Sequence, residues 1–298
     1  MTISSPSARP QPGGTWQYAG RDVARIGYGA MQLERLHSDP TAARRLLRMA
    51  VDLGVDHIDT ADFYANGFVN NIIRDELRSE DATITTKIGA VTHPGGPIPL
   101  RAAQRPEDLR SSVESNLRSL GREQLDVVNL RRVEAGLGIR AEGDQIVDLD
   151  DQLATMVALR QEGKIGAIGL SNVTLSDVQR AVPVELAEVQ NSYSVISRDD
   201  EGILELCLAE SIAWVPFFPL GGAFPGVPKV TDSTDVHHIA SHLNATASQI
   251  GLAWLLQHAP NVLLIPGTTT AAHLSENIAA SEVQLAEEDI AALDTLLV

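Results

Sequence analysis

Short apolar runs alternate with longer segments of helical periodicity from residue 22 onward. The short runs are continuously apolar, as is typical of parallel strands covered by helices on both faces. The pattern predicts strands at residues 23–27, 57–59, 82–87, 125–130, 165–170, 186–190, 212–216 and 262–265. It predicts helices at residues 41–53, 68–77, 106–120, 149–161, 175–181, 203–210, 247–258 and 271–280. Such an alternation implies a parallel sheet with right-handed crossovers.

Two arrangements of this sheet are possible, a closed eight-stranded barrel and an open doubly wound sheet. An open dinucleotide-binding sheet needs a glycine-rich turn directly between its first strand and its first helix. The nearest match, GYGAMQ at residues 27–32, lacks the third glycine, and roughly ten more residues pass before the helix begins. We therefore predict an α/β fold, a single (β/α)8 TIM barrel that spans residues 15–298.

Several segments lie outside the regular alternation. Residues 1–14 indicate a flexible tail without the apolar region of a signal peptide, and residues 16–23 indicate a short N-terminal hairpin that turns at Ala19 and Gly20. Long segments follow three of the strands, at residues 88–105, 131–146 and 217–231. In a barrel these loops lie on the C-terminal face, where this fold builds its active sites.

Composition narrows the possible partners. The 298 residues include 23 Lys and Arg against 39 Asp and Glu, so the formal net charge is −16. Such a charge disfavours nucleic acid and anionic membranes as partners, and no stretch approaches the ~18 continuous apolar residues of a membrane helix. The single cysteine, Cys207, excludes an internal disulfide framework and cysteine-rich metal sites. We expect a soluble protein of the reducing cytoplasm, and the oligomeric state stays open.

No metal site is predicted. His238 and His242 lie four residues apart on a predicted helix, but no third ligand follows at a convincing spacing, which favours a solvated helix face. The segment GLSNV at residues 169–173 lacks the second glycine of a nucleophile elbow, and the chain has no P-loop motif.

Polar residues gather at the ends of three predicted strands. They are Asp59, Asp62 and Tyr64 in HIDTADFY, Lys87 at the end of the third strand, and Arg131 after the fourth. The C-terminal ends of barrel strands meet at one mouth, so we expect these side chains to converge. Because side chains alternate along a strand, Asn129 shares the face of Arg131, and this polar face is expected to look into the mouth.

A lysine, an aspartate and a tyrosine in one barrel mouth suit proton transfer. A phenol has a pKa of about 10, too high for efficient proton donation at neutral pH. A Lys87 ammonium held by Asp59 is expected to stabilise the phenolate and lower the pKa of Tyr64. The alternative is a structural Asp59–Lys87 ion pair with Tyr64 as a half-buried packing residue, and spacing alone leaves both open.

Four segments in this order resemble the motifs of the aldo-keto reductases. They are HIDTADFY, TTKIG, GLSNV and IPGTTTAAHLSENIAA, at residues 57–64, 85–89, 169–173 and 265–280. The resemblance covers the chain from Trp16 onward. Within that family, LDVVNLR at residues 125–131 and VPFFPLGG at residues 215–222 look most like bacterial pyridoxal reductases.

The resemblance implies direct hydride transfer from a reduced nicotinamide to an aldehyde or ketone, with Tyr64 as the proton donor. The catalytic residues it implies are Asp59, Tyr64, Lys87 and Arg131. The cofactor-binding residues it implies are Gly29, Ala30, Met31, Asp59, Ser171, Asn172, Gln190, Phe217, Phe218, Pro219, Leu220, Gly221, Gly267, Thr268, Thr269, Thr270, His273, Glu276 and Asn277. Among them, Ser171, Asn172 and Gln190 would hold the carboxamide. Phe217 would stack on the nicotinamide, in place of the family's usual tyrosine. The turn at residues 218–221 would follow the pyrophosphate. The adenosine end would be enclosed by Gly267, Thr268, Thr269, Thr270, His273, Glu276 and Asn277.

Two positions depart from the family pattern. Arg131 stands where the family usually has histidine, and a guanidinium donates hydrogen bonds to oxygen but does not shuttle a proton in this pH range. This favours a substrate with an acidic hydroxyl beside its carbonyl, as in pyridoxal. Gly267 and His273 stand where many members clamp the 2′-phosphate with lysine and arginine. NADPH is expected because backbone N–H groups near Ala271 remain available, with NADH as the alternative.

The expected function is therefore NAD(P)H-dependent reduction of an aldehyde or ketone to an alcohol, with a small-molecule carbonyl compound as the partner and pyridoxal, reduced to pyridoxine, as the leading substrate. One alternative is a keto-sugar or specialised-metabolite reductase on the same scaffold, distinguished by the three long loops. Another is a nucleotide-binding regulatory module with little turnover. The presence of Asp59, Tyr64 and Lys87 argues against that module.

Overall fold

Strands and helices alternate along the chain in a computed structural model that describes residues 10–78, 80–96, 98–133, 138–222 and 226–296. The strands are β1 (Thr15–Tyr18), β2 (Arg21–Ala24), β3 (Tyr28–Gly29), β4 (His57–Asp59), β5 (Thr83–Ile88), β6 (Ala90–Thr92), β7 (Leu100–Ala102), β8 (Leu125–Arg131), β9 (Ile165–Ser171), β10 (Leu186–Gln190) and β11 (Ala213–Trp214). The α-helices are α1 (Pro40–Asp52), α2 (Phe68–Leu77), α3 (Pro106–Leu120), α4 (Leu149–Gln161), α5 (Leu175–Ala181), α6 (Glu201–Ala209), α7 (Thr234–Leu243), α8 (Ala247–His258), α9 (Ala271–Ala279) and α10 (Glu287–Asp294). Short 3₁₀ helices are η1 (Ala30–Leu36), η2 (Gly143–Gln145), η3 (Val182–Val184), η4 (Val230–Asp232) and η5 (Ala280–Glu282).

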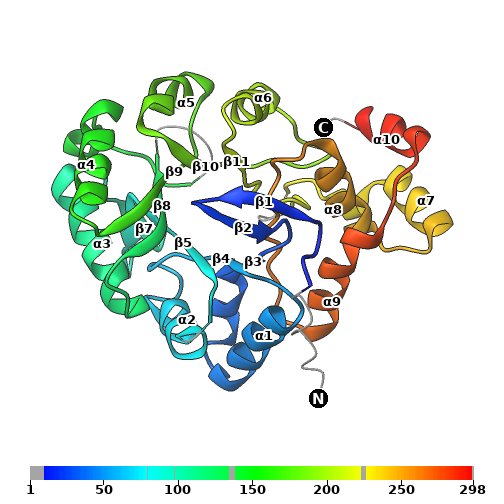
Figure 1. The fold of residues 1–298 in the computed structure, drawn as a ribbon, viewed down its shortest axis with the longest axis horizontal. Coiled ribbons are helices and arrows are strands. Elements are labelled where there is room, and N and C mark those ends of the chain that lie inside the picture. The colour runs from blue at the N-terminus through cyan, green and yellow to red at the C-terminus, as the bar shows by residue number, and fades with distance from the viewer. Residues whose placement is uncertain (1–9, 79, 97, 134–137, 223–225, 297–298) are drawn as a thin grey trace, which may run out of the picture.

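Seven parallel strands form one curved sheet, in the order β3, β4, β5, β8, β9, β10 and β11. The segment after α8 closes this sheet. Val262 forms a parallel bridge with Trp214 of β11, and Leu264 forms one with Ile26 just before β3. The predicted α/β barrel is thus confirmed, with its eighth strand reduced to isolated bridges (Figure 1).

The helices surround the barrel strands (Figure 1), and their buried apolar residues belong to the hydrophobic core. Helix α1 buries Leu46, Leu47 and Ala50, the face that its periodicity predicts. Its first turn is capped by Asp39, whose side chain accepts a hydrogen bond from the Ala42 backbone N–H at 3.0 Å. Local patterning therefore set both the position and the orientation of this helix.

The first predicted strand, at residues 23–27, is misplaced. Val23 and Ala24 belong to β2, and the first barrel strand comes later, with the bridge at Ile26 and then β3. A short apolar run fits a hairpin strand and a barrel strand equally well, so periodicity did not separate the two.

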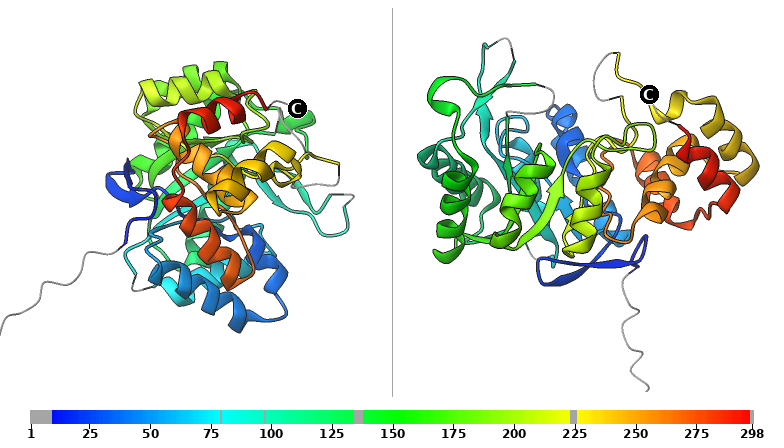
Figure 2. Two further views of the ribbon diagram at one scale, coloured as in Figure 1. Left: turned by 90° about the vertical axis from the view of Figure 1, so that its right-hand side faces the viewer. Right: turned by 90° about the horizontal axis from the view of Figure 1, so that it is seen from above.

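The predicted N-terminal hairpin is present as β1 and β2 and covers one end of the barrel (Figure 1). It turns through Ala19 and Gly20, both at positive φ, as the sequence predicted. Tyr18 and Val23 pack with Leu263 and other apolar residues of the barrel interior. The hairpin therefore closes the end of the barrel that lies opposite the long loops (Figure 2).

The three long segments project from the other end of the barrel (Figure 2, right). The first contains the antiparallel pair β6 and β7, which was not predicted. The second contains η2, and its residues 134–137 lie outside the described residues. The third is pinned by a bridge between Gly221 and Lys229, and its residues 223–225 lie outside the described residues.

The predicted tail is only partly described, because residues 1–9 lie outside the described residues. The backbone N–H of Arg25 donates to the Gly14 carbonyl at 2.9 Å, and that of Ile26 donates to the Pro12 carbonyl at 3.1 Å. The last residues of the predicted tail therefore pack on the barrel.

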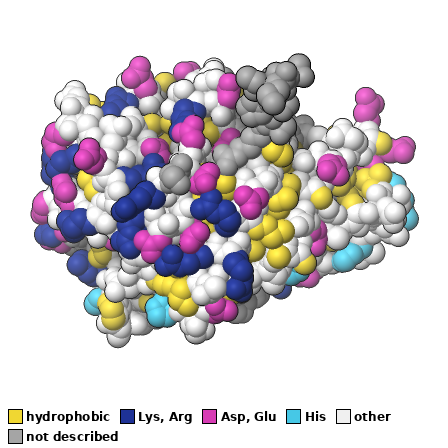
Figure 3. Space-filling view, turned by 60° about the horizontal axis from the view of Figure 1, so that its bottom comes forward, with side chains coloured by type: hydrophobic (Ala, Val, Ile, Leu, Met, Phe, Trp, Pro, Cys, Tyr) yellow, Lys and Arg dark blue, Asp and Glu magenta, His cyan; other side chains and the backbone are white. Residues whose placement is uncertain are grey.

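Acidic and basic side chains interleave on the face shown in Figure 3. On α1, Arg44 forms an ion pair with Asp75 at 2.9 Å and Arg48 forms one with Glu80 at 2.5 Å. Within the described ranges, no helix combines the length and the apolar character needed to cross a bilayer.

Side chains inside the barrel lie in rows, because neighbouring parallel strands are in register. One row is Lys87, Asn129, Gly169 and Glu188, across β5, β8, β9 and β10. The next row toward the long loops is Arg131, Ser171 and Gln190. A Cβ on Gly169 would lie 2.0 Å from Asn129 Oδ1 and 2.9 Å from Glu188 Cγ. This glycine therefore leaves the space in which two polar side chains meet across β9.

We expect Gly169→Ala to lower the free energy of unfolding by about 1–3 kcal/mol, because the added methyl overfills the barrel interior. Urea unfolding at pH 7 measures the change. Gly202→Ala in α6 is the matched control, since its Cβ would meet only Leu175 Cδ2 at 3.8 Å. That variant should be neutral or stabilised by up to about 1 kcal/mol. Equal effects of the two substitutions would contradict the packing argument.

Candidate active site

The polar residues predicted at the strand ends do converge. Asp59 ends β4, Lys87 lies near the end of β5 and Arg131 ends β8, while Tyr64 lies in the turn that leads to α2. The three strands follow one another in the sheet. Their ends therefore form one side of the barrel mouth, beneath the long loops.

A buried ion pair forms the base of this site. Lys87 is 7% exposed and Asp59 is 4% exposed, and their side chains form a salt bridge. The Lys87 ammonium also donates to the Thr60 carbonyl at 3.1 Å, and Gln190 Nε2 donates to Asp59 Oδ2 at 2.8 Å. Burial is the largest single influence on the pKa of Lys87 and lowers it, but the charge and hydrogen bond of Asp59, together with Tyr64 and Glu188, outweigh burial, so the net shift is upward. Lys87 is therefore held as a cation.

Tyr64 lies against this pair, with Lys87 Nζ 5.6 Å from the centre of its ring. Burial raises the pKa of Tyr64 above its ordinary value, although the charge of Lys87 acts in the opposite direction. The predicted downward shift is wrong, because the loss of hydration outweighs the neighbouring cations. The side chain is consequently a neutral phenol at pH 7, the form that can donate a proton.

Arg131 brings a second cation to the mouth. It contributes a smaller lowering to the pKa of Tyr64, and burial lowers the pKa of its own guanidinium. Its Nη1 is buried and has no hydrogen-bond partner within the described chain. An unsatisfied donor of this kind is costly to bury, so it marks a place for an acceptor from outside the chain.

The rim beside Arg131 holds the residues that the resemblance assigns to the carboxamide. Ser171 and Gln190 occupy the same row as Arg131. Asn172 follows at φ 62°, and its backbone N–H donates to the Gln190 carbonyl at 3.0 Å. Gln190 is fully buried, yet its Oε1 has no partner among the described residues. This orphaned acceptor suits the NH₂ group of a carboxamide.

The segment after β11 continues the rim. The Phe217 backbone N–H donates to the Asn191 carbonyl at 3.0 Å, which joins this segment to the end of β10. Phe217 and Phe218 meet edge to face at 5.1 Å, and Phe218 adopts φ 54°. The chain then turns through Pro219 and Leu220, and the Gly221 N–H donates to the Phe218 carbonyl at 2.8 Å.

The residues predicted for the adenosine end lie where the barrel closes. A Cβ on Gly29 would lie 2.4 Å from the Ile265 carbonyl oxygen, and one on Gly267 would lie 2.6 Å from the Gly29 carbonyl oxygen. The other residues predicted for this end are Thr268 and Thr269 before α9, and His273, Glu276 and Asn277 within α9. Ala30 and Met31, predicted to bind the cofactor, follow Gly29 in η1. Thr270 caps α9 by accepting a hydrogen bond from the His273 N–H at 3.3 Å. The exposed start of α9 therefore offers free N–H groups to an anion.

Asp62 serves the scaffold. Its carboxylate accepts hydrogen bonds from Ser115 Oγ at 2.6 Å and Ser119 Oγ at 2.7 Å, which ties the β4–α2 turn to α3. It lines a cavity of about 280 Å³ that also reaches Lys87, between this turn, β6 and α3. Among the described residues, no group of three potential metal ligands is present.

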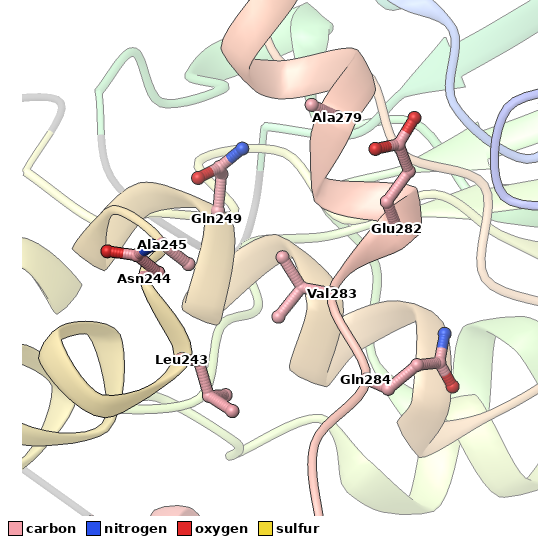
Figure 4. Close-up of a pocket in the computed structure, with 8 residues that line it drawn as sticks. All are labelled: Leu243, Asn244, Ala245, Gln249, Ala279, Glu282, Val283 and Gln284. Carbon is pink, nitrogen blue, oxygen red and sulfur yellow. The ribbon is translucent and has the colours of Figure 1, made fainter.

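A second hollow is formed among the helices of the C-terminal part of the chain (Figure 4). It measures about 240 Å³ and is bordered by α7, α8 and the segment after α9. Its lining residues are Leu243, Asn244, Ala245, Gln249, Ala279, Glu282, Val283 and Gln284. None of the predicted site residues is among them.

Sequence reasoning missed two polar residues beneath the mouth. Glu188 is 1% exposed and accepts hydrogen bonds from Gln190, Asn129 and Tyr18. Gln104 donates to the Arg131 carbonyl at 2.9 Å and fixes the end of β8. The signal for Glu188 was a lone acidic residue in the otherwise apolar start of β10, LAEV.

Comparisons with known proteins agree with this geometry. The sequence model described as the aldo/keto reductase family matches residues 25–298. The chain belongs to the aldo/keto reductase family. It is thus an oxidoreductase of that family, which supports reduction of carbonyl compounds as its general reaction.

Two curated relatives cover nearly the whole chain. A pyridoxine 4-dehydrogenase of Escherichia coli is 42% identical over 288 residues, which are 94% of this chain and 97% of that protein. An uncharacterized oxidoreductase of Schizosaccharomyces pombe is 32% identical over 98% of this chain and 93% of its own length.

Solved structures share the fold. An aldo-keto reductase from Klebsiella pneumoniae in complex with NADPH has a TM-score of 0.79 and 25% identity, over 95% of this chain and 94% of that one. A thermostable aldo-keto reductase in complex with the inhibitor epalrestat has a TM-score of 0.78 and 27% identity, over 95% and 99% of the two chains.

We expect Lys87→Met to lower the free energy of unfolding by about 3–5 kcal/mol, because it leaves the buried Asp59 carboxylate unpaired. Urea unfolding at pH 7 measures the loss. The double variant Asp59→Asn/Lys87→Met should lose less, since no charge remains buried without its partner. Arg44→Met removes the exposed ion pair between Arg44 and Asp75 and is the control. It should lower the free energy of unfolding by less than about 1 kcal/mol. A loss for Lys87→Met no larger than that of the control would contradict the burial of this pair.

Proposed function

We propose that this aldo/keto reductase reduces pyridoxal to pyridoxine with NADPH, by hydride transfer at the mouth of the barrel. The observation that carries the proposal is the buried, unpartnered Nη1 of Arg131 near Tyr64. Pyridoxal carries an acidic ring hydroxyl beside its aldehyde, and an arginine donor suits that oxygen. The 42% identity to a pyridoxine 4-dehydrogenase over almost the full length supports the same substrate pair.

The rim residues suit a nicotinamide dinucleotide. The unpartnered Gln190 Oε1 would accept a hydrogen bond from the carboxamide, with Ser171 and Asn172 beside it. Phe217 would stack on the ring, and the turn from Phe218 to Gly221 would follow the pyrophosphate. Residues 267–270 and the first part of α9 would enclose the adenosine end, while Gly29, Ala30 and Met31 would contact the cofactor from the end of β3 and the start of η1. When bound, the reduced cofactor supplies a hydride to the carbonyl carbon.

NADPH is proposed over NADH on the basis of α9. Its first turn carries free N–H groups and the positive end of the helix dipole, Thr270 lies directly before it, and Thr268 lies two residues earlier. A protein of this fold at 25% identity has been solved in complex with NADPH, which supports the assignment.

Tyr64 would complete the reaction. Its hydroxyl donates a proton to the carbonyl oxygen as that oxygen becomes negative, which yields the alcohol and leaves a phenolate. Lys87, kept cationic by Asp59, stabilises this phenolate through its charge. A proton from solvent then restores the phenol. Burial holds the pKa of Tyr64 high, so the residue is protonated at the start of each reduction.

Arg131 would orient the substrate. It offers a donor to the ring hydroxyl and so aligns the neighbouring aldehyde with Tyr64. The loops that surround the mouth, β6–β7 and residues 131–146 and 217–231, would complete the pocket. We place this activity in the cytoplasm, because the single cysteine is buried in the core, as suits a reducing compartment.

We expect Tyr64→Phe to lower kcat by about 10²–10⁴-fold, because the proton donor is lost. The dissociation constant for NADP⁺ should change less than about twofold, since the hydroxyl acts mainly in the transition state. Loss of reduced-nicotinamide absorbance measures kcat, and quenching of tryptophan fluorescence measures binding. A variant that keeps most of its activity would remove Tyr64 from the mechanism.

We expect Arg131→Met to lower kcat/KM for pyridoxal by roughly 10- to 150-fold, the range of one hydrogen bond to a charged group. 4-Pyridinecarboxaldehyde, which lacks the hydroxyl, is the matched control substrate and should lose far less. The loss of Arg131 also removes a cation that lowers the pKa of Tyr64. The alkaline limb of the reduction profile, where the phenol deprotonates, should therefore move to higher pH. Equal losses on both substrates with an unmoved profile would refute this role.

The substrate itself is tested by a panel of aldehydes, ketones and keto-sugars with the wild-type enzyme. Pyridoxal should have the highest kcat/KM. A panel member that exceeds it by about a hundredfold would replace pyridoxal while leaving the reductase class intact. Cofactor binding without turnover of any carbonyl would instead indicate a nucleotide-binding module.

A further inference from the structure

A network of polar side chains runs through the barrel interior, from the β1–β2 hairpin at the closed end to the candidate active site at the barrel mouth. Tyr18 of β1 donates from its hydroxyl to Glu188 Oε2 at 2.6 Å, and the same hydroxyl lies 2.5 Å from Thr85 Oγ1. Glu188 Oε1 accepts hydrogen bonds from Asn129 Nδ2 and, at 2.8 Å, from Gln190 Nε2. Gln190 then connects this network to the site.

Burying the carboxyl group of Glu188 in the barrel interior is unfavourable in free energy. Glu188 is 1% exposed, and a buried carboxyl group loses hydration that only specific partners can replace. Burial raises its pKa to about 7. The space for Glu188 also requires a glycine at position 169, because a side chain on Gly169 would collide with Asn129 and Glu188. A purely apolar interior would need neither feature.

The network determines how the Gln190 amide is turned. Nε2 donates to Asp59 Oδ2 and to Glu188 Oε1, each at 2.8 Å. Both amide hydrogens therefore point at carboxyl oxygens, and flipping the amide would place Oε1 against two acceptors. Oε1 faces the other way, buried and without a partner among the described residues. With Asp59 alone, only one of the two hydrogens would be held.

We propose that Glu188 is a positioning residue that holds the Gln190 amide with its oxygen toward the carboxamide of the nicotinamide. The inference rests on the proposed role of Gln190 in cofactor binding. Glu188 touches neither cofactor nor substrate and acts only through Gln190. It makes the orientation of the nicotinamide depend on a carboxyl group one row deeper in the barrel.

Comparing the binding of two cofactors distinguishes a positioning role of Glu188 from a purely structural one. NADP⁺ has a carboxamide whose NH₂ can donate to Gln190 Oε1, whereas its 3-acetylpyridine analogue has a methyl group in that position. Affinities for both are measured by fluorescence quenching or calorimetry, without any carbonyl substrate. Wild-type protein should bind NADP⁺ about five- to tenfold more tightly than the analogue, the order of one neutral hydrogen bond.

Glu188→Met removes the acceptor while keeping the length of the side chain. We expect it to weaken NADP⁺ about five- to tenfold and the analogue less than about twofold, so that the preference disappears. Glu188→Gln retains an acceptor oxygen and should restore most of the preference. Glu188→Asp shortens the side chain by one methylene, so its carboxylate no longer reaches Gln190 and the preference for NADP⁺ should again be lost. This variant replaces Glu188→Met in the experiment if the methionine variant does not fold.

Leu263→Ala is the control for general damage to the barrel interior, since Leu263 is fully buried with Tyr18 and Val23 and is absent from this network. It should lower stability yet keep the preference for NADP⁺. Equal weakening of both cofactors by the Glu188 variants would reduce Glu188 to a structural residue. A wild-type protein that binds both cofactors equally would also overturn the inference. A protein that shows the preference but does not reduce pyridoxal would keep the inference and lose the proposed substrate.

Discussion

The buried ion pair of Lys87 and Asp59 is the interaction around which the barrel mouth is built. Two charges removed from water are tolerated only when their remaining hydrogen-bonding capacity is met. Here the Thr60 carbonyl and the Gln190 amide meet it, and they come from the end of β4 and from β10. The pair therefore links three strands that lie far apart in the sequence, and it fixes the electrostatic surroundings of Tyr64.

Those surroundings give Tyr64 a resting state suited to reduction. Two nearby cations favour the phenolate, yet burial outweighs them and the phenol keeps its proton. The same cations then stabilise the phenolate once the proton has left. Burial and charge thus act at different stages of the proposed reaction, with the phenol favoured before proton transfer and the anion supported after it.

The interior of the barrel is divided between apolar and polar contacts. Tyr18 shows both, since its ring packs with Val23 and Leu263 while its hydroxyl joins the carboxyl group of Glu188. The hairpin therefore does more than exclude water from the closed end of the barrel. It supplies a hydrogen-bond donor to a network that ends at the residues of the mouth.

The sequence by itself determined what depends on local pattern and on residue identity. The helix faces follow from periodicity, as α1 shows, and the convergence of Asp59, Lys87 and Arg131 follows from the rule that parallel strands end at one edge. The tertiary structure decided what depends on contacts between distant residues. The apolar run at residues 23–27 could not reveal where the hairpin ends and the barrel begins. The sign of the Tyr64 pKa shift depended on burial, and the role proposed for Glu188 depends on partners as remote as Tyr18, 170 positions away. Solvent exclusion and the pairing of distant strands are properties of the closed barrel, and no local segment carries them.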